Sequence, residues 1–496
     1  SLNGNNLFSK PEFKGNINWD NFDIRNFVDK YLQKQVALAD MDALTDISLS
    51  GSVYANLFDE MIIMHNILFN IDGIKFDGEL SMSSWSSKDI QFVLKGNDID
   101  LDKYLPISNH NKQTESVNTN KTYSEINTAH KSGLKLIKKY LNKLHLKGEI
   151  NIDKVDISGI KLDNVFLDIE TRMASLLLSH KFELFNGYSE GRINVDITEE
   201  YPYIEINEKL SHLTVNKLKK LIDNKHNAMI GNISNFLNID DTTLLEFDSH
   251  SKLELVYKNK QILFDTIKLD ITLEDKITPK KKWDLFYEGP AIIDMKNGNI
   301  NLNNFNAGLN ALKLSGSIKG SALHDKPMVA GLIFSQKFNL KNIISDFTKI
   351  KFHAINPESL SNVSFRNTFH FNSSNKTLTI DFLDTKIDNS LLNGQLSATL
   401  DKNPNIEFNA SVDKANLDMY IPKKNIEAKP KKNTQNNLDN KKENHLNSGN
   451  SFINKCNIIG RIKFKEAVLL NIDMNNPVID MKILNNFMDV NIHSNV

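Results

Sequence analysis

Apolar and polar residues alternate with a period of two along most of this chain. In residues 150–157 four aliphatic residues are separated mainly by Asn and Asp, and the same alternation recurs in 192–197, 299–302 and 376–382. A period of two places one set of side chains on each face of a β-sheet. The pattern therefore predicts many antiparallel β-hairpins in series.

Turn-forming pairs fall between these stretches and predict where the hairpins reverse. The expected turns are Asp77-Gly78, Asn186-Gly187, residues 296–299 and Asn393-Gly394.

A helical period replaces the alternation in three places. Amphipathic helices are expected over 24–31, 134–144 and, capped by Thr214, 214–236. Residues 108–127 and 423–450 are rich in Asn, Lys and Ser and poor in apolar residues, so they are expected to be mobile loops.

An internal repeat organises the chain. Residues 15–106 align with 331–422 at a constant offset of 316, with about one position in five identical, and the parallel resumes between 146–150 and 458–462. The expected domains are the end of a first repeat unit at 1–106, a loop at 107–130, a central unit at 131–422 with a helical insert near 214–238, a loop at 423–452 and the start of a further unit at 453–496.

The repeated motifs resemble signatures of the AsmA family. The string Asn97–Pro106 and its copy Asp413–Pro422 each end in Leu-Asp-x-Tyr-(Leu/Ile)-Pro, and a Gly-x-Ile strand follows each copy. The hairpin 183–191 resembles that family's Gly-rich turn, and 336–341 resembles another of its elements, whereas 215–290 departs from the pattern. The residues that carry the match are Asp102, Tyr104, Pro106, Gly148, Gly187, Gly191, Asp418, Tyr420, Pro422 and Gly460.

The resemblance implies a fold and a role. The resemblance to AsmA-like and TamB-like proteins implies an extended, curved antiparallel β-sheet with a few amphipathic helices. Such a sheet forms a groove, β-taco or solenoid-like in shape. The resemblance also implies a periplasmic location, an N-terminal helix in the inner membrane that would precede Ser1, and phospholipid movement in outer-membrane biogenesis. The implied partners are phospholipid acyl chains and, as a second set, outer-membrane assembly components. Membrane contact would run through segments outside this sequence.

Alternation supplies the candidate residues for such a groove. The lipid-facing candidates are Ile150, Ile152, Val165, Leu167, Ile193, Val195, Ile197 and Ile462. Two other readings remain open: an ordinary closed β core, and a scaffold for outer-membrane proteins whose sheet edges pair with client strands.

Composition narrows the function further. The net charge of −1 argues against a dedicated nucleic-acid binder, and the single cysteine, Cys456, excludes an intramolecular disulfide framework and multi-thiolate metal sites. No stretch of 18 apolar residues exists. The start at Ser1, without Met or a signal-peptide pattern, suggests a piece of a longer protein.

No motif in the sequence predicts catalysis, a metal or a cofactor. The string Gly187–Gly191 reads GxSxG, but a nucleophile elbow needs a helix after it and a strand is expected here. Asp98, Asp100 and Asp102 imitate the start of an EF-hand loop that lacks its later Gly and Glu. The 13 histidines form no metal-binding cluster. We therefore expect a protein that is not an enzyme.

Overall fold

The computed structural model is mainly β, with 25 strands and few helices, which confirms the predicted class. It describes residues 2–26, 40, 42–84, 88–105, 138, 142, 144–199, 201–215, 243–256, 260–275, 282–323, 325–347, 356–400, 404–421, 456–484 and 487–495. The chain divides into two compact units, which are described separately: residues 1–235 with 239–282, and residues 236–238 with 283–496.

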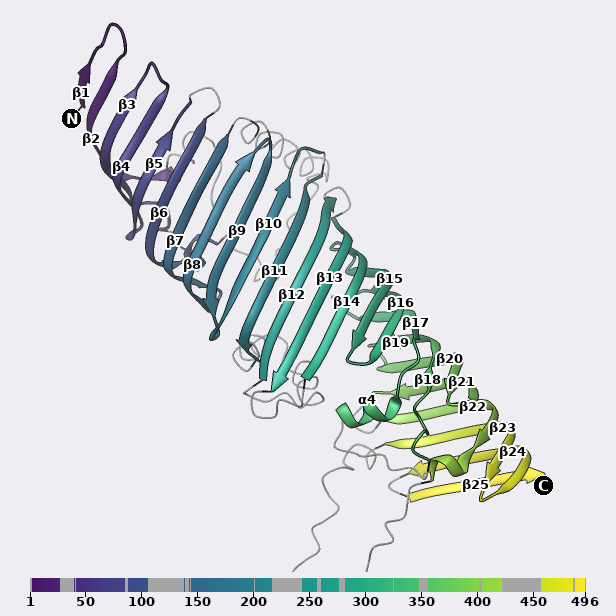
Figure 1. The fold of residues 1–496 in the computed structure, drawn as a ribbon. Helices are drawn as coiled ribbons and strands as arrows, with labels where there is room; N and C mark the ends of the chain where they lie inside the picture. The colour runs from purple at the N-terminus through teal and green to yellow at the C-terminus, as the bar shows by residue number, and fades with distance from the viewer. Residues whose placement is uncertain are drawn as a thin grey trace, which may run out of the picture. The chain divides into compact units, whose positions relative to one another are not determined.

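The strands of unit 1 lie side by side in one open sheet (Figure 1). They are β1 Leu2–Asn5, β2 Glu12–Phe22, β3 Ile47–Asn56, β4 Met61–Ile71, β5 Ile74–Met82, β6 Asp89–Asp100, β7 His145–Ile157, β8 Ile160–Arg172, β9 Ser175–Leu184, β10 Gly187–Asp196, β11 Tyr203–Thr214, β12 Thr243–Val256 and β13 Gln261–Asp275. Each strand pairs with the next one along the chain, and the predicted antiparallel pairing holds for every pair of these described strands but one.

That exception is the parallel pair of β6 and β7. The 3-10 helix η1, Leu101–Tyr104, follows β6, and the chain needs residues 101–144 to return to the same end of the sheet. Parallel strands require such a long crossover connection, whereas antiparallel strands can be joined by a tight turn.

Unit 2 also consists mainly of strands that follow one another along the chain. Its elements are β14 Lys282–Asp294, β15 Asn299–Leu309, β16 Leu312–Ser321, β17 Met328–Ser335, α4 Leu340–Phe347, β18 Val363–Ser364, β19 Arg366–Asn372, β20 Thr377–Ile387, β21 Ser390–Thr399, β22 Asn405–Asn416, η3 Leu417–Tyr420, β23 Asn457–Leu469, β24 Ile472–Leu484 and β25 Phe487–Asn495. Here too the described pairs are antiparallel except one, β22 with β23, which flanks the second 3-10 helix, η3.

Two of the four predicted turns are correct. Residues Phe185 and Asn186 form a turn with positive φ before β10, and 295–298 form another. The prediction was wrong at Gly78 and Gly394, which lie inside β5 and β21. A Cβ at either glycine would overlap a backbone carbonyl oxygen of the neighbouring strand, so these glycines permit close strand approach.

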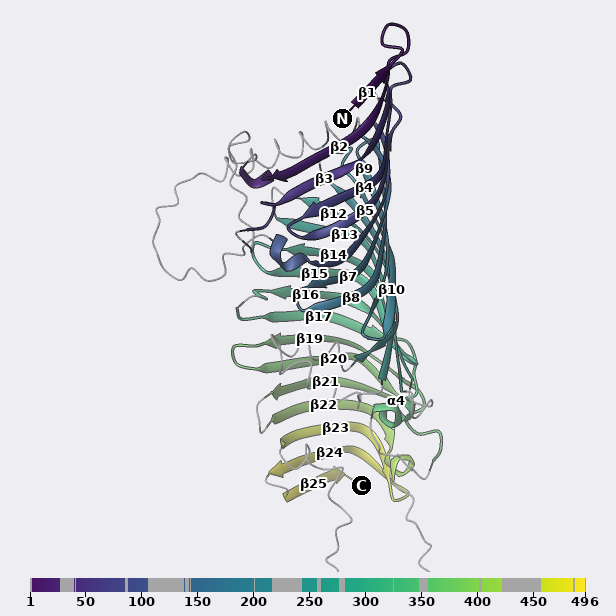
Figure 2. The same ribbon diagram turned by 90° about the vertical axis from the view of Figure 1, so that its left-hand side faces the viewer.

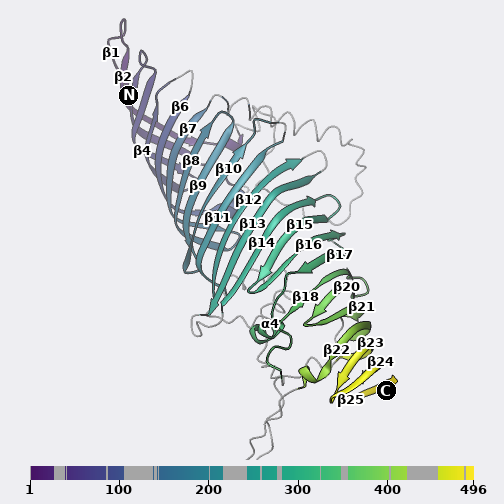
Figure 3. The ribbon, with the colours of Figure 1, turned by 45° about the vertical axis from the view of Figure 1, so that its right-hand side comes forward.

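Asparagines with positive φ interrupt the strands at corresponding places. Asn66, Asn164, Asn304 and Asn476 have φ of 50–53° and each coincides with a register shift in its ladder. Asn tolerates the left-handed region, and such irregularities bend a strand. Figure 2 shows β19 to β25 curving along their length, and Figure 3 shows β7 to β13 side by side.

Among the described residues, a small buried cluster lies in each unit. In unit 1 it consists of Ile99, Ile152, Val155 and Val165. In unit 2 it consists of Val412, Phe464, Ala467 and Met474.

Most of the predicted helices and both predicted loops lie outside the described residues. This applies to 27–31, to most of 134–144, to 216–236, and to 108–127 and 423–450.

Candidate functional site: the apolar face of unit 1

Strand pairing in unit 1 brings aliphatic residues together on one side of the sheet. Ile150 pairs with Leu167, and Ile193 pairs with Leu178 on one side and Ile206 on the other. Residues directly opposite one another share a face, as do alternate residues of a strand. We call this set the apolar face, and its members are Leu146, Gly148, Ile150, Ile152, Val165, Leu167, Ile169, Thr171, Leu176, Leu178, His180, Phe182, Ser189, Gly191, Ile193, Val195, Ile204, Ile206, Glu208, Leu210, Phe247, Ser249, Ser251 and Leu253.

The opposite face of the same strands is charged. Lys181 forms an ion pair with Glu190 at 3.5 Å between β9 and β10, and Lys252 lies 3.7 Å from Glu205 between β12 and β11. The sheet is therefore amphipathic: one face favours contact with water and the other favours contact with apolar groups.

No described element covers the apolar face with a second layer. The described strands contact their pairing neighbours, and the only further contacts of note are those of η1 with β7 and η3 with β23. Accordingly Ile150, Leu167, Ile193 and Val195 are only half-buried.

The predicted groove residues fall into two groups. Ile152 and Val165, 8% and 5% exposed, belong to the buried cluster of unit 1, and Ile197, 8% exposed, follows the end of β10. Ile462 lies on β23 and packs against the cluster of unit 2. The remaining four candidates are the half-buried residues of the apolar face.

One polar pair, His180 with Glu208, interrupts the apolar face. His180 on β9 and Glu208 on β11 both lie opposite Gly191 of β10, and their side chains meet across it, with His180 Nε2 3.0 Å from Glu208 Oε2. A Cβ at Gly191 would overlap the Glu208 carboxylate, so the glycine makes room for the pair. Ser189, 1% exposed, donates its hydroxyl proton to Glu208 Oε1. His180 also stacks on Phe182 at 5.2 Å.

This cluster lacks the arrangement of a hydrolytic triad. In a triad the histidine contacts the serine through one ring nitrogen and the acid through the other. Here the same nitrogen, His180 Nε2, faces both Glu208 and Ser189, the latter at 3.5 Å, and Ser189 bonds to the carboxylate instead. Ser189, the serine of the GxSxG string, therefore lies inside β10, and its hydrogen bond to Glu208 connects β10 with β11.

A group of hydrogen bonds around Asp72 and Tyr104, which we call the polar junction, lies at the end of the β6–β7 pair in unit 1. Asp72 accepts hydrogen bonds from the backbone N–H groups of Leu44 at 2.6 Å and Asp46 at 3.1 Å, and from the Tyr104 hydroxyl at 3.1 Å. Partial burial and the bond to Asp72 raise the pKa of Tyr104 to about 12. Asp102 of η1 accepts from Ser158 N at 2.6 Å in the β7–β8 turn.

Unit 2 contains the same hydrogen bonds. Asp388 accepts from Leu360 N at 2.7 Å, Asn362 N at 3.2 Å and the Tyr420 hydroxyl at 2.8 Å, and Asp418 accepts from Leu470 N at 2.6 Å. Burial and the bond to Asp388 raise the pKa of Tyr420 above its usual value.

Cavities beside the two junctions are lined by corresponding positions but differ in charge. They have volumes of about 380 Å³ in unit 1 and 530 Å³ in unit 2. Asp98 pairs with Lys154 in the first, whereas Lys414 pairs with Glu466 in the second. The signs of the two charges are therefore exchanged between the units, and in each unit the two register partners still have opposite charges.

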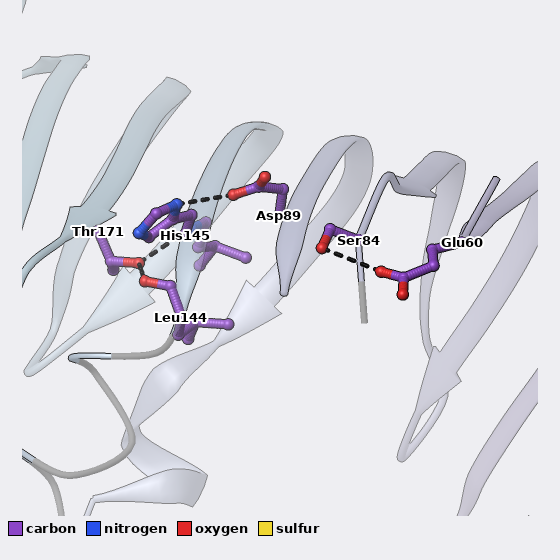
Figure 4. A network of polar contacts seen from close by, with 7 residues as sticks. Glu60, Ser84, Asp89, Leu144, His145 and Thr171 are labelled. Carbon is purple, nitrogen blue, oxygen red and sulfur yellow. Dashed lines mark hydrogen bonds and ion pairs between the residues drawn. The ribbon is translucent and has the colours of Figure 1, made fainter. Parts of the chain in front are cut away.

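The other end of each parallel pair carries a second polar contact. In unit 1 His145 Nδ1 lies 2.7 Å from Asp89 Oδ1, and Thr171 bonds to Leu144 O at 3.1 Å (Figure 4). In unit 2 the corresponding contact joins Asn457 Nδ2 to Asn405 Oδ1 at 2.9 Å.

The motif residues that the structure describes serve these junctions or the strand contacts beside them. Gly148 and Gly460 each lie against a phenylalanine ring of the parallel partner strand, Phe92 and Phe408. A Cβ at Gly187 would overlap the Ser211 carbonyl oxygen. Pro106 and Pro422 lie outside the described residues.

Reasoning from the sequence missed the pair His180–Glu208. The two residues are far apart in sequence, and only the registers of β9, β10 and β11 bring them together. The available signal was a polar residue at an inward position in each of two otherwise alternating strands.

No protein-family model, curated protein or solved structure matches this chain. Within the described ranges no three His, Cys, Asp or Glu side chains are placed to hold a metal ion. Nor does any described helix have the length and apolarity to cross a membrane.

Proposed function

We propose that this chain is a section of an AsmA-like bridge whose apolar face carries phospholipid acyl chains in outer-membrane biogenesis. The observation that carries the proposal is the apolar face itself. It extends over strands β7 to β12 with half-buried aliphatic side chains and without a described covering layer. Soluble monomers seldom leave an apolar sheet face without a covering layer, because contact of apolar surface with water is costly.

The occupant that suits this face is an uncharged hydrocarbon chain. His180 and Glu208 are the only titratable residues among its members, and their side chains contact each other. Burying one methylene group contributes about 0.8 kcal/mol, and dispersion contacts impose no register along the chain. The curved sheet would form the floor of a groove. The proposed setting is the periplasm, with a membrane anchor outside this sequence.

We further propose that the two units are copies of one repeat with an offset near 316 residues. The shared hydrogen bonds of Asp72 and Asp388, the parallel pair beside each 3-10 helix and the exchanged charges support this relation.

Phospholipid binding can be tested with one substitution on each face of β10. Val195→Asp places a charge on the apolar face, and Asn194→Asp places the same charge on the opposite face. Native mass spectrometry of the purified protein should detect bound phospholipid in the parent and in Asn194→Asp, and much less in Val195→Asp. A parent protein free of phospholipid after purification from membranes would refute the lipid bridge.

The second candidate function is a scaffold that pairs with client strands, because the edge of a sheet can accept an extended peptide. Binding of unfolded β-barrel peptides by lipid-free protein would favour this role.

A further inference from the structure

The polar pair on the apolar face lies within a row that is aliphatic in the preceding strands. The row runs from Ile150 through Leu167 to His180, and then through Gly191 and Glu208 to Ser249. From β9 to β12 this row is therefore polar or lacks a side chain.

Apolar side chains flank this row on both sides. One strip consists of Leu178, Ile193 and Ile206 on β9 to β11 and is followed by Ser251 on β12. The other consists of Phe182, Leu210 and Phe247, with the buried Ser189 at its β10 position. The two strips are separated by four residues along a strand, or about 13 Å. An acyl chain can therefore lie on one strip without touching the other.

We propose that His180 and Glu208, the latter held by its hydrogen bond from Ser189, confine acyl chains to the strip of Leu178, Ile193 and Ile206 as they cross β9 to β11. This inference rests on the proposed lipid function and names the path within it. Ser189 is already buried and bonded to Glu208, and the side chains of His180 and Glu208 are 10% and 21% exposed. A chain lying over the pair would remove its remaining water without replacing the lost hydrogen bonds, which is unfavourable.

The pair does not belong to a wider charged network on this face. The charged neighbours of the pair on β9 to β12, Lys181, Glu190, Arg192, Lys209 and Asp248, occupy alternate positions and so lie on the opposite face. The pair is thus an isolated polar feature in an apolar surface, as expected of an element that steers an apolar cargo.

Site-specific photo-crosslinking tests the path. Benzoylphenylalanine is introduced at Ile193 in one protein and at Leu210 in another, and each is incubated with vesicles of phosphatidylethanolamine and phosphatidylglycerol carrying radiolabelled acyl chains. We expect at least about tenfold more lipid adduct at Ile193 than at Leu210, because leaving a buried polar group unsatisfied changes an equilibrium by that order.

The double variant His180→Leu/Glu208→Leu removes the polar barrier. Replacing a buried ion pair with apolar residues of similar volume is often neutral or stabilising, so the sheet should remain folded. Adduct at Leu210 should then rise to within about twofold of that at Ile193. The control Glu208→Gln removes the charge but keeps a polar side chain, and it should leave the preference for Ile193 in place.

The outcomes separate this inference from the function on which it rests. Equal labelling at both positions in the parent would overturn the confined path and leave the lipid bridge intact. Labelling at neither position would overturn the lipid bridge. The comparison within the parent protein decides the question even if the double variant does not fold.

Discussion

Replacing Ile152 or Val195 with aspartate places the same charge on the same face of the sheet in two different surroundings. Ile152 is 8% exposed and packs with Ile99, Val155 and Val165. Val195 lies on the half-buried part of the apolar face, away from that cluster. The two variants should therefore differ greatly in stability.

The expected magnitudes follow from burial. Ile152→Asp loses roughly 2–3 kcal/mol of apolar burial and adds several kcal/mol for an unpaired carboxyl group among aliphatic side chains. The sum, about 5 kcal/mol or more, is comparable with the total stability of a typical domain. Val195→Asp loses about half as much apolar burial and can turn its carboxylate to water, so we expect about 1–2 kcal/mol.

Hydrogen exchange measures both effects locally, which matters because a chain with two units need not unfold in one step. For Ile152→Asp, peptides of β7 and β8 should lose at least about a thousandfold in protection, since each 1.4 kcal/mol is a factor of ten. For Val195→Asp, peptides of β10 should lose about tenfold. Asn151→Asp, which places the charge on the exposed opposite face of β7, should change little. Equally severe losses in both variants would mean that Val195 lies in a closed core and would contradict the open apolar face.

Three further outcomes test the junctions and the strand contacts. Asp72→Asn weakens charge-assisted hydrogen bonds to backbone amides and to Tyr104, so urea unfolding should show a loss of about 2–3 kcal/mol. Because the pKa of Tyr104 is raised to about 12 by burial and its bond to Asp72, its contribution to stability is full below about pH 10 and is lost as the pH rises towards 12. In Tyr104→Phe, midpoints measured over that pH range should fall less steeply than in the parent. Gly148→Ala displaces only the Phe92 ring and should cost about 1 kcal/mol, whereas Gly187→Ala meets backbone atoms of β11 and should cost several times more by the same measurement.

The alternation of the sequence was sufficient to predict a mainly β chain, because period-two patterning determines which residues face together. It was not sufficient for the turns. Asp77-Gly78 and Asn393-Gly394 are residue pairs typical of hairpin turns. Both glycines lie inside strands instead, where a carbonyl oxygen of the neighbouring strand leaves no space for a Cβ. A glycine in the sequence can mean either a hairpin turn or a close approach of two strands, and only the strand pairing shows which of the two applies.

Register-dependent features could not be derived from the sequence alone. The left-handed asparagines Asn164 and Asn476 shift the pairing inside a strand, and period-two reasoning assumes that no such shift occurs. Ile152 and Val195 have the same pattern in the sequence, but Ile152 packs in the buried cluster with Ile99, Val155 and Val165, and Val195 does not. The pair His180–Glu208 depends on two successive registers and is invisible to any local pattern.

The polar junctions explain how an open sheet with such small clusters can hold a parallel pair together. Closing the connection 101–144 costs roughly 3 kcal/mol in chain entropy by the loop-length relation. Each charge-assisted hydrogen bond made by Asp72 contributes about 1.5–3 kcal/mol, so two or three of them offset that cost. A hydrogen bond needs a particular donor and acceptor, and Asp72 and Asp388 accordingly have the same kinds of partner in both units. The register partners Asp98 with Lys154 and Lys414 with Glu466 need only opposite signs, and it is these charges that are exchanged between the units.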